Sequence, residues 1–392
     1  MKIQPKIMSN VCLTAHPLGC KIEVQKQIDY VLKKGKIKGP KTALILGCSG
    51  GYGLATRIAL AYGCDTQTLG VSLEREPAEN KTASVGFYNN QAFSALAKEN
   101  GKKEKTLNLE AFSNEAKEQT IAAAKEFFGA QKIDLVVYSL ASPMRTDPKD
   151  GVSYKSVLKP IGQPYQGKTV DIFTGAIKTV EVEPATEEEA KATVKVMGGE
   201  DWSLWIDALL KADLLSQGAI TVAYSYIGPE ITYPIYREGT IGQAKVDLEQ
   251  SASAIDKKLS AVKGKAYVSV NKALVTRASS VIPVVPLYVA ILFKVMAEKG
   301  LHEGCIEQEY RMLEVMYGHD SVKTDDEGRI RLDDWEMRPE IQQAVFSVWD
   351  KITQDNLSQY ADLEKVRKDF MNLHGFDVEG VDYDQDVDPM GV

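Results

Sequence analysis

Cysteine is scarce in this chain of 392 residues, and the five that occur are far apart. They form no CxxC pair, and an odd number of thiols cannot all pair within one chain. Neither a disulfide framework nor a zinc site is predicted, and reduced thiols are typical of the cytosol. The cysteines are Cys12, Cys20, Cys48, Cys64 and Cys305. The histidines also lack metal-ligand spacing, so we expect no metal and a structural role for His16, His302, His319 and His374.

Two further absences narrow the class of protein. The formal net charge is -7 and no block of Lys and Arg stands out, so the chain is not expected to bind nucleic acid. The most apolar window, Val281 to Ala297, contains prolines and a lysine and is shorter than the roughly 20 residues of a spanning helix. The amino-terminal residues also lack the apolar core of a secretory signal. We therefore expect a soluble cytoplasmic protein without stable membrane insertion.

From about Lys41 the sequence alternates short, β-rich apolar runs with longer amphipathic segments. This rhythm is typical of βαβ units around a parallel sheet that is covered on both faces. The sequence therefore predicts an α/β protein with a Rossmann-type, doubly wound parallel sheet. Strands are expected at 42–46, 66–73, 103–109, 133–140, 219–226 and 266–271, and helices at 54–62, 92–99, 114–128, 201–215 and 241–259.

Two parts of the chain depart from this rhythm. Residues 143–199 are rich in Pro, Gly, Thr and Lys, and we expect small hairpins inserted there over the sheet edge, on the substrate side. Residues 282–392 are expected to be mainly helical, with helices at 287–299, 306–317, 339–352 and 363–373 and a solvated acidic tail at 377–388. The whole chain, 1–392, is interpreted as a single elaborated Rossmann domain.

A glycine-rich segment follows the first expected strand and opens a helix. Glycines let such a turn tighten and bring backbone N–H groups to a pyrophosphate, while the helix offers the positive end of its dipole. A turn that merely joins strand to helix is the alternative. We predict a dinucleotide-binding turn made of Gly47, Cys48, Ser49, Gly50, Gly51, Tyr52 and Gly53.

An acidic residue at the end of the second strand agrees with this prediction. Glu74 lies where a carboxylate accepts hydrogen bonds from both ribose hydroxyls and repels a 2′-phosphate, which favours NADH. Leu73 precedes it, and the adjacent Arg75 is a possible partner for the phosphate of NADPH. Further cofactor contacts are expected at the carboxyl ends of the next two strands, at Glu110, Ala111, Ser139, Leu140 and Ala141.

The pair Tyr236 and Lys245 lies beyond the cofactor turn, nine positions apart. Short-chain dehydrogenases place Tyr and Lys four apart on one helix, whereas residues nine apart would occupy opposite faces. The pair can still act together if Tyr236 precedes the helix, and the segment from Thr240 to Gln243 predicts a capping-box start. A nearby ammonium would favour the phenolate, and the same Lys can bind the nicotinamide ribose. Packing for the tyrosine and solvation for the lysine are the alternatives.

Together these motifs resemble the trans-2-enoyl-CoA reductases of the FabV type, a family that also includes enoyl-acyl-carrier-protein reductases. The resemblance runs nearly end to end and implies that Tyr236 is the proton donor, that Tyr226 contacts the substrate thioester and that Lys245 binds cofactor. It also implies cofactor contacts at Leu274, Val275 and Thr276. Its motifs are His16-Pro17-x-Gly19-Cys20, Gly47 to Gly53, Tyr138 to Ala141, Met197 to Trp202, Tyr236-x8-Lys245, Phe293 to Met296 and Gly375-Phe376-Asp377.

The resemblance implies a reaction in fatty acid metabolism. Hydride passes from NADH to the β carbon of a trans-2-enoyl thioester such as crotonyl-CoA, and a proton is delivered to the α carbon. The enolate oxygen needs donors, for which Tyr226 and Tyr236 are candidates. Coenzyme A and acyl carrier protein both remain open as carriers, the apolar run at 282–293 is either an acyl pocket or core, and the family suggests a monomer.

Two other functions stay open. A short-chain carbonyl or alcohol reductase shares the fold, although its Tyr and Lys are spaced differently. A non-catalytic NAD-sensing protein would keep the turn but would not need Tyr236 and Lys245.

Overall fold

The computed structural model of the protein describes residues 1–8, 11–279, 282 and 284–391. A seven-stranded parallel sheet with the order β13-β12-β11-β6-β3-β4-β5 forms its centre. The chain builds outward from β3 in one direction and from β6 in the other, which is the doubly wound arrangement that the sequence predicted. The strands are β3 (Thr42–Leu46), β4 (Gln67–Ser72), β5 (Glu104–Asn108), β6 (Ile133–Tyr138), β11 (Leu215–Ser225), β12 (Lys265–Val270) and β13 (Ile330–Arg331).

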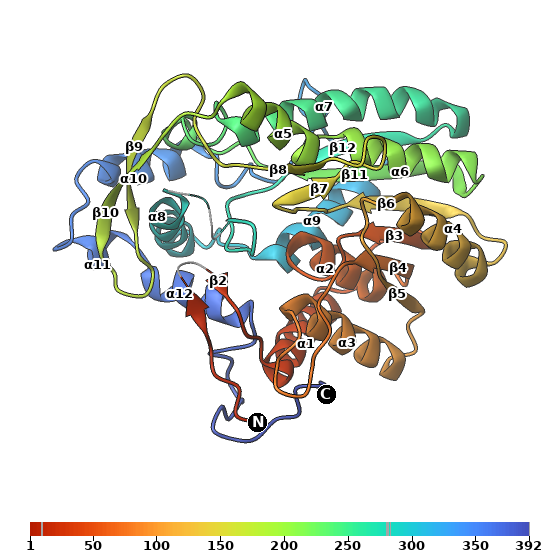
Figure 1. Cartoon of the computed structure of the whole chain (residues 1–392), viewed down its shortest axis with the longest axis horizontal. Coiled ribbons are helices and arrows are strands. Elements are labelled where there is room, and N and C mark those ends of the chain that lie inside the picture. Colours follow the sequence, from red (N-terminus) through yellow and green to blue (C-terminus); the bar gives the residue numbers. More distant parts are fainter. Residues whose placement is uncertain (9–10, 280–281, 283, 392) are drawn as a thin grey trace.

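Helices cover both faces of this sheet (Figure 1). Because side chains alternate along a strand, Ala43 and Ile45 of β3 pack on one face, whereas Leu44 and Leu46 pack on the other. The first face carries α1 (Pro17–Lys34), α2 (Gly51–Ile58), α3 (Val85–Glu99) and α9 (Cys305–Tyr317). The second face carries α4 (Asn114–Phe128), α6 (Glu200–Lys211) and α7 (Thr240–Leu259). Burial on both sides explains why the central strands β3 and β6 are apolar almost without alternation, whereas the edge strand β5 is not.

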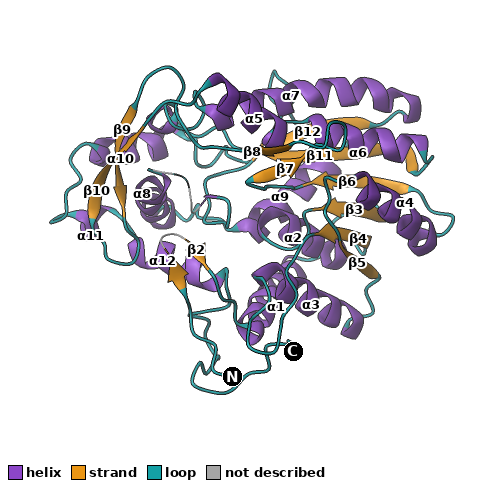
Figure 2. Cartoon of the chain, viewed as in Figure 1, coloured by secondary structure: helices purple, strands orange, loops and turns teal. Residues whose placement is uncertain are grey.

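A third apolar cluster lies beside the sheet rather than over it (Figure 2). It is built on α8 (Val285–Glu298), which packs against α10 (Pro339–Trp349), α12 (Leu363–Asn372) and the hairpin of β9 (Tyr165–Val170) and β10 (Ile177–Val182). The short helix α11 (Leu357–Tyr360) also belongs to it. The expectation that the hairpins lie over the sheet edge is therefore wrong for β9 and β10, because β9 packs against α8 with Val170 buried and Ile177 partly buried in this cluster.

Several elements differ from the expected ones. Helix α1 was not anticipated, although Pro17 begins it and His16 Nδ1 accepts from the Gly19 N–H at 3.3 Å. Helix α5 (Glu187–Met197) occupies part of the segment expected to hold only hairpins, and a capping box between Thr186 and Glu189 starts it. Helix α3 begins seven residues before its expected start at position 92. Helix α6 ends at Lys211, short of the expected position 215, where β11 begins.

The remaining short strands form two hairpins, β1 (Ile7–Met8) with β2 (Val11–Cys12) and β7 (Met144–Thr146) with β8 (Ser153–Lys155). The acidic tail is not simply solvated. The Tyr383 ring lies 5.0 Å from that of His16, and the Met1 ammonium donates to the Val387 carbonyl at 2.9 Å. The two ends of the chain therefore pack together. None of the described helices has the length and apolarity needed to cross a membrane.

Candidate functional site

The glycine turn joins β3 to α2 at the carboxyl edge of the sheet. Gly47 has φ +88, and a Cβ there would lie 2.3 Å from the Ser139 carbonyl oxygen. A Cβ on Gly53 would lie 2.0 Å from the Gly47 carbonyl oxygen. Both positions require glycine because β3, β6 and α2 approach closely. Cys48, between them, is buried with its thiol on the Asn90 side-chain oxygen at 3.7 Å.

The same turn leaves room above the start of α2. A Cβ on Gly50 would meet nothing within 4 Å, and no side chain caps the helix, which begins at Gly51. The first N–H groups of a helix lack intrahelical partners and carry the positive end of its dipole. The turn therefore fits an anion such as a pyrophosphate.

Glu74 lies beside this turn with its side chain only 6% exposed. Its carboxylate accepts hydrogen bonds from the hydroxyls of Ser49 and Ser84, each at 2.5 Å. Arg277 Nη1 is 3.5 Å away. The Asn108 side chain fixes the backbone of Glu74 by donating to its carbonyl and accepting from its N–H. The carboxylate is thus held rigidly against the cofactor turn.

The two residues on either side of Glu74 in the sequence, Leu73 and Arg75, differ in their surroundings. Leu73 is 60% exposed, which leaves its apolar surface open beside the carboxylate. Arg75, the possible partner of a 2′-phosphate, donates to the Thr82 carbonyl at 3.3 Å.

The other expected cofactor residues end strands β5 and β6. The Glu110 carboxylate accepts from the Phe112 N–H at 3.3 Å, so it is tied to its own turn. Ala111 is buried, and its carbonyl accepts from Trp205 Nε1. Ser139 lies under Gly47 and begins the segment with the half-buried Leu140 and the exposed Ala141. These positions share the carboxyl edge of the sheet, where doubly wound folds bind ligands.

The loop that follows β12 lies over the cofactor turn. A Cβ on Gly51 would find Thr276 Cγ2 at 3.9 Å. The Ser279 hydroxyl fixes the loop by donating to the Leu274 carbonyl at 2.6 Å, and it accepts from the Thr276 N–H at 2.8 Å. The structure thus brings Thr276 to the glycine turn, whereas Leu274 and Val275 line a pocket described below.

Tyr236 lies in the turn before α7, as the nine-residue spacing required. Its ring meets that of Tyr226 edge-on, with centroids 5.0 Å apart. Burial raises the pKa of Tyr236, and Arg237 opposes this rise. Within the described part of the chain, no group hydrogen-bonds to the Tyr236 hydroxyl. The phenol is therefore neutral at pH 7 and has a proton to donate.

The start of α7 differs from the expected capping box. Gly239 is the N-cap, and the Thr240 hydroxyl donates to the Val157 carbonyl at 2.5 Å instead of capping the helix. Lys245 lies in the second turn of α7, as expected, and its ammonium donates to the Tyr224 carbonyl at 2.9 Å. Burial lowers the pKa of Lys245 to about 8. The ammonium contacts the end of β11 rather than the Tyr236 phenol. The structure therefore shows no contact by which Lys245 would favour the phenolate of Tyr236.

Two buried glutamates lie behind Tyr224 of β11 and Tyr226, which follows this strand, and the sequence did not reveal either one. Tyr224 donates to Glu309 at 2.8 Å, and Tyr226 donates to Glu336 at 3.0 Å. Both carboxylates are fully buried. They come from segments far along the chain, so no local pattern could have indicated them. Ser84 could have been found, because it stands at the N-cap of α3, where serine is favoured.

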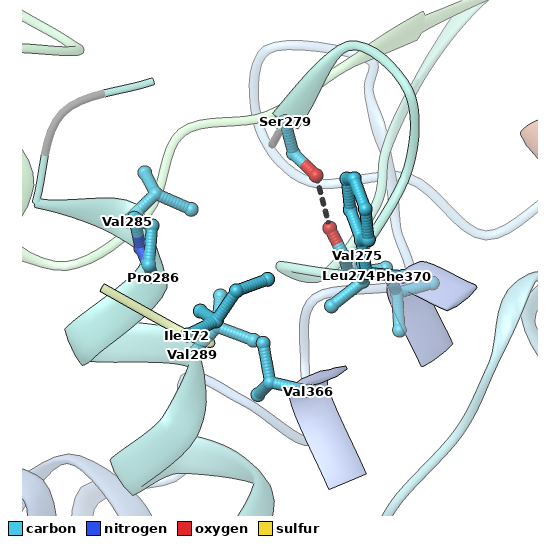
Figure 3. Close-up of a pocket in the computed structure, with 9 residues that line it drawn as sticks. All are labelled: Ile172, Leu274, Val275, Ser279, Val285, Pro286, Val289, Val366 and Phe370. Carbon is cyan, nitrogen blue, oxygen red and sulfur yellow. Dashed lines mark hydrogen bonds between the residues drawn. The ribbon is translucent and has the colours of Figure 1, made fainter. Parts of the chain in front are cut away.

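A narrow apolar pocket opens beside the loop after β12 (Figure 3). Val285, Pro286 and Val289 contribute to it from α8, and Val366 and Phe370 contribute from α12. The other lining residues are Ile172, Leu274, Val275 and Ser279. Leu287 and Ile291 of the same apolar run are fully buried in the core instead. The apolar run at 282–293 thus contributes to the pocket and to the core. Residue 283 lies outside the described residues.

Oxidoreductases that take a nicotinamide dinucleotide are the class that combines this sheet, this glycine turn and a ribose-side carboxylate with a buried tyrosine pair. Residues 81–317 match the family model described as "Trans-2-enoyl-CoA reductase catalytic region", and residues 2–79 match "NAD(P)H binding domain of trans-2-enoyl-CoA reductase". The chain belongs to the trans-2-enoyl-CoA reductase family.

Individual relatives agree with this assignment. The chain is 57% identical to a trans-2-enoyl-CoA reductase [NADH] of Brachyspira hyodysenteriae, over 99% of this chain and 100% of the relative. It is 53% identical to an enoyl-[acyl-carrier-protein] reductase [NADH] of Cytophaga hutchinsonii, over 99% and 98%. The crystal structure of Clostridium acetobutulicum trans-2-enoyl-CoA reductase in complex with NADH matches with a TM-score of 0.96 and 47% identity, over 99% and 98%.

A third family model, described as "Enoyl reductase FAD binding domain", matches residues 324–387. This segment does not fit a flavin dinucleotide. Its three glycines, Gly328, Gly375 and Gly380, do not form the G-x-G-x-x-G pattern, and none of them lies between a strand and a helix. Its helices α10 and α12 bury their apolar faces against α8. No step of the reaction is therefore assigned to a flavin.

Proposed function

We propose that this chain is an NADH-dependent reductase of the C2=C3 double bond of trans-2-enoyl-CoA thioesters, such as crotonyl-CoA, in fatty acid metabolism. The buried Tyr236, with a hydroxyl free to donate and its ring against Tyr226, is the observation that carries this proposal. A cofactor turn alone would suit many reactions, whereas a proton donor beside it is needed to complete a reduction. The names of the relatives point to the same chemistry.

We assign each proposed cofactor residue to one part of NADH. The glycine turn and the start of α2 suit the pyrophosphate, and Glu74 suits the hydroxyls of the adenosine ribose. Lys245 and Thr276 are assigned to the nicotinamide half, and Leu73 to the adenine end. When bound, NADH supplies the hydride that adds to the β carbon. The remaining proposed contacts are Glu110, Ala111, Ser139, Leu140, Ala141, Leu274 and Val275.

Tyr236 acts on the charge that develops at the thioester oxygen. Tyr226, the other candidate donor, already gives its hydroxyl proton to Glu336, so its role is one of positioning. The Tyr236 hydroxyl donates to this oxygen, since burial keeps the phenol protonated. Tyr236 supplies the proton that ends on the α carbon, which completes the saturated acyl thioester, and the phenolate regains a proton from water. Tyr226 positions the thioester beside the Tyr236 ring.

The pocket of Figure 3 is proposed to take the acyl chain. Eight of its nine lining side chains are apolar, which suits a hydrocarbon tail, and three of its residues belong to the loop that covers the glycine turn. Its narrowness favours short chains.

A second candidate, an enoyl-acyl-carrier-protein reductase, is favoured by the name of the Cytophaga relative. We place coenzyme A first because the Brachyspira relative at 57% identity carries that name.

The five free thiols suit a cytoplasmic protein. We propose that the protein acts as a monomer.

Steady-state oxidation of NADH tests these assignments. Crotonyl-CoA is expected to turn over, with a higher kcat/KM than crotonyl-acyl-carrier-protein and with NADPH a poorer donor than NADH. A simple ketone is expected to give no turnover, which separates this reaction from that of a carbonyl reductase. Binding of NADH without turnover of any enoyl thioester would contradict the proposal and favour a sensing role.

A further inference from the structure

We propose that Glu336 is a positioning residue for the reduction, because its buried carboxylate holds the Tyr226 phenol against Tyr236. This inference rests on the proposed function. Glu336 lies in the turn between β13 and α10, some hundred residues from the tyrosines along the chain. Its side chain is nevertheless fully buried next to the reacting end of the site.

Three donors converge on this carboxylate. The Tyr226 hydroxyl donates to Oε1 at 3.0 Å, and the Tyr288 hydroxyl donates to the same oxygen at 2.6 Å. The Ala273 N–H donates to Oε2 at 2.7 Å. Each donor comes from a different segment that borders the site, namely the end of β11, helix α8 and the loop after β12. Glu336 therefore fixes these segments relative to one another.

The Lys272 ammonium supplies a positive charge near Glu336 without a hydrogen bond to it. Burial raises the pKa of Glu336, while the hydrogen bonds from Tyr288 and the Ala273 N–H and the charge of the Lys272 ammonium oppose the rise. Lys272 itself is 1% exposed, and its ammonium donates to the carbonyls of Ala273 and Glu303. A buried carboxylate that is held by three donors and a nearby cation is costly to build for packing alone.

The hydrogen bond to Glu336 decides where the Tyr226 hydroxyl lies. The Tyr226 ring touches Tyr236 with one edge, so a shift of its hydroxyl end also shifts the ring against the proton donor. A misplacement of about 1 Å near reacting groups costs on the order of 10²-fold in rate. The position of Glu336 is thus expected to matter more than its charge.

Two substitutions separate position from charge. Glu336→Asp keeps the charge but withdraws the carboxylate by about 1.5 Å, the length of one carbon–carbon bond. Glu336→Gln keeps the length and removes the charge. Its oxygen can accept from the Ala273 N–H, and its NH₂ group can donate to the oxygens of Tyr226 and Tyr288, whose hydroxyls rotate freely.

Turnover of crotonyl-CoA and binding of NADH are measured for both variants. The aspartate variant is expected to lose kcat on the order of 10²-fold with an unchanged Kd for NADH. The glutamine variant is expected to stay within about tenfold of wild type, the equivalent of one hydrogen bond. In a Tyr226→Phe background, the aspartate substitution is expected to cost less kcat than in the wild type, because only the contacts with Tyr288 and Ala273 remain to be lost. Tyr288→Phe is the matched control, since it removes a donor from the same carboxylate and leaves Tyr226 in place.

An aspartate variant with wild-type kcat would overturn the inference, and so would a glutamine variant less active than the aspartate one. A wild-type protein that does not turn over crotonyl-CoA would instead count against the proposed function. Thermal unfolding of the same variants tests the contact whatever the substrate is, because Glu336→Asp and Tyr226→Phe are expected to be non-additive in stability. Additive effects would contradict the role of Glu336 directly.

Discussion

Tyr236 lies in a turn rather than on a helix, and among the described residues its hydroxyl has no hydrogen-bond partner. Tyr236→Phe removes this hydroxyl and keeps the ring contact with Tyr226. We expect kcat with crotonyl-CoA to fall on the order of 10²- to 10⁴-fold, the range of a lost general acid. NADH binding, measured by fluorescence, is expected to stay unchanged. A variant with full turnover would remove Tyr236 from the role of proton donor.

Glu74 is held by two serine hydroxyls with an arginine beside it, so its replacement alters a fixed charge. Glu74→Ala removes the carboxylate that repels a 2′-phosphate and leaves the Arg277 guanidinium nearby. We expect the NADH over NADPH preference in kcat/KM to narrow by about tenfold, since hydrogen bonds to a charged group are worth about 1.5–3 kcal/mol.

Ser84→Ala is the control for this change, because it removes one hydrogen bond and keeps the charge. Its effect on the preference is expected to be smaller. An unchanged preference in Glu74→Ala would show that the selectivity lies elsewhere.

At the scale of elements, the turn between β3 and α2 contains glycines with two different functions. Gly53 is required for packing, whereas the space above Gly50 is open. Gly53→Ala is expected to lower the free energy of unfolding by roughly 1–3 kcal/mol, since its Cβ would overlap the Gly47 carbonyl. Gly50→Ala is expected to leave stability intact and to weaken NADH binding, because its methyl group enters the space assigned to the pyrophosphate.

Urea unfolding and NADH titration measure these two effects. Equal loss of stability in both variants, or undiminished NADH binding by Gly50→Ala, would contradict this division of functions.

Helix α8 places one face in the core and another face against the pocket. Val289 faces the pocket, so Val289→Trp fills it. We expect kcat/KM for trans-2-octenoyl-CoA to fall at least about tenfold more than for crotonyl-CoA, in line with the cost of poorly fitted methylene groups. Val295→Trp, on the same helix but outside the pocket lining, is the matched control. Equal losses of kcat/KM for both substrates in Val289→Trp would show that the acyl chain does not bind in this pocket.

At the scale of the whole molecule, Glu309 connects helix α2, which follows β3, with the strands β11 and β12 of the other half of the sheet. Its carboxylate accepts from Thr56 of α2, Tyr224 of β11 and Asn271 after β12. Burial raises the pKa of Glu309 to about 7, although these donors oppose the rise. An acid with a raised folded-state pKa contributes stability below its unfolded pKa and loses that contribution as the pH rises through its folded pKa.

Glu309 is therefore expected to reduce the free energy of unfolding by about 3 kcal/mol between pH ~4.5 and pH ~7. Glu309→Gln lacks this titration, so its stability relative to wild type is expected to increase over the same interval. Urea unfolding at several pH values measures the difference. Glu314→Gln, on an exposed position of the same helix, is the control and is expected to follow the wild-type curve. Parallel curves for Glu309→Gln and wild type would contradict the role of Glu309.

The sequence by itself determined the features that depend on neighbouring residues. Continuous apolar runs predicted β3 and β6 because both faces of the sheet are covered. The glycine spacing predicted the tight turn between β3 and α2 because steric limits on φ act within a few residues. The spacing of Tyr236 and Lys245 placed the tyrosine before α7 because helical periodicity is local.

Only the tertiary structure decided which distant groups meet. Glu309 binds Tyr224 and Glu336 binds Tyr226, across 85 and 110 positions of the chain. Such pairs leave no pattern in a single sequence, because the contact depends on how β11, β12, α9 and the turn after β13 pack. For the same reason the structure alone showed that Lys245 donates to the Tyr224 carbonyl and that the hairpin of β9 and β10 lies on α8. Local sterics and periodicity thus fix the turn and the strands, whereas burial of side chains from distant segments fixes how the tyrosines are held.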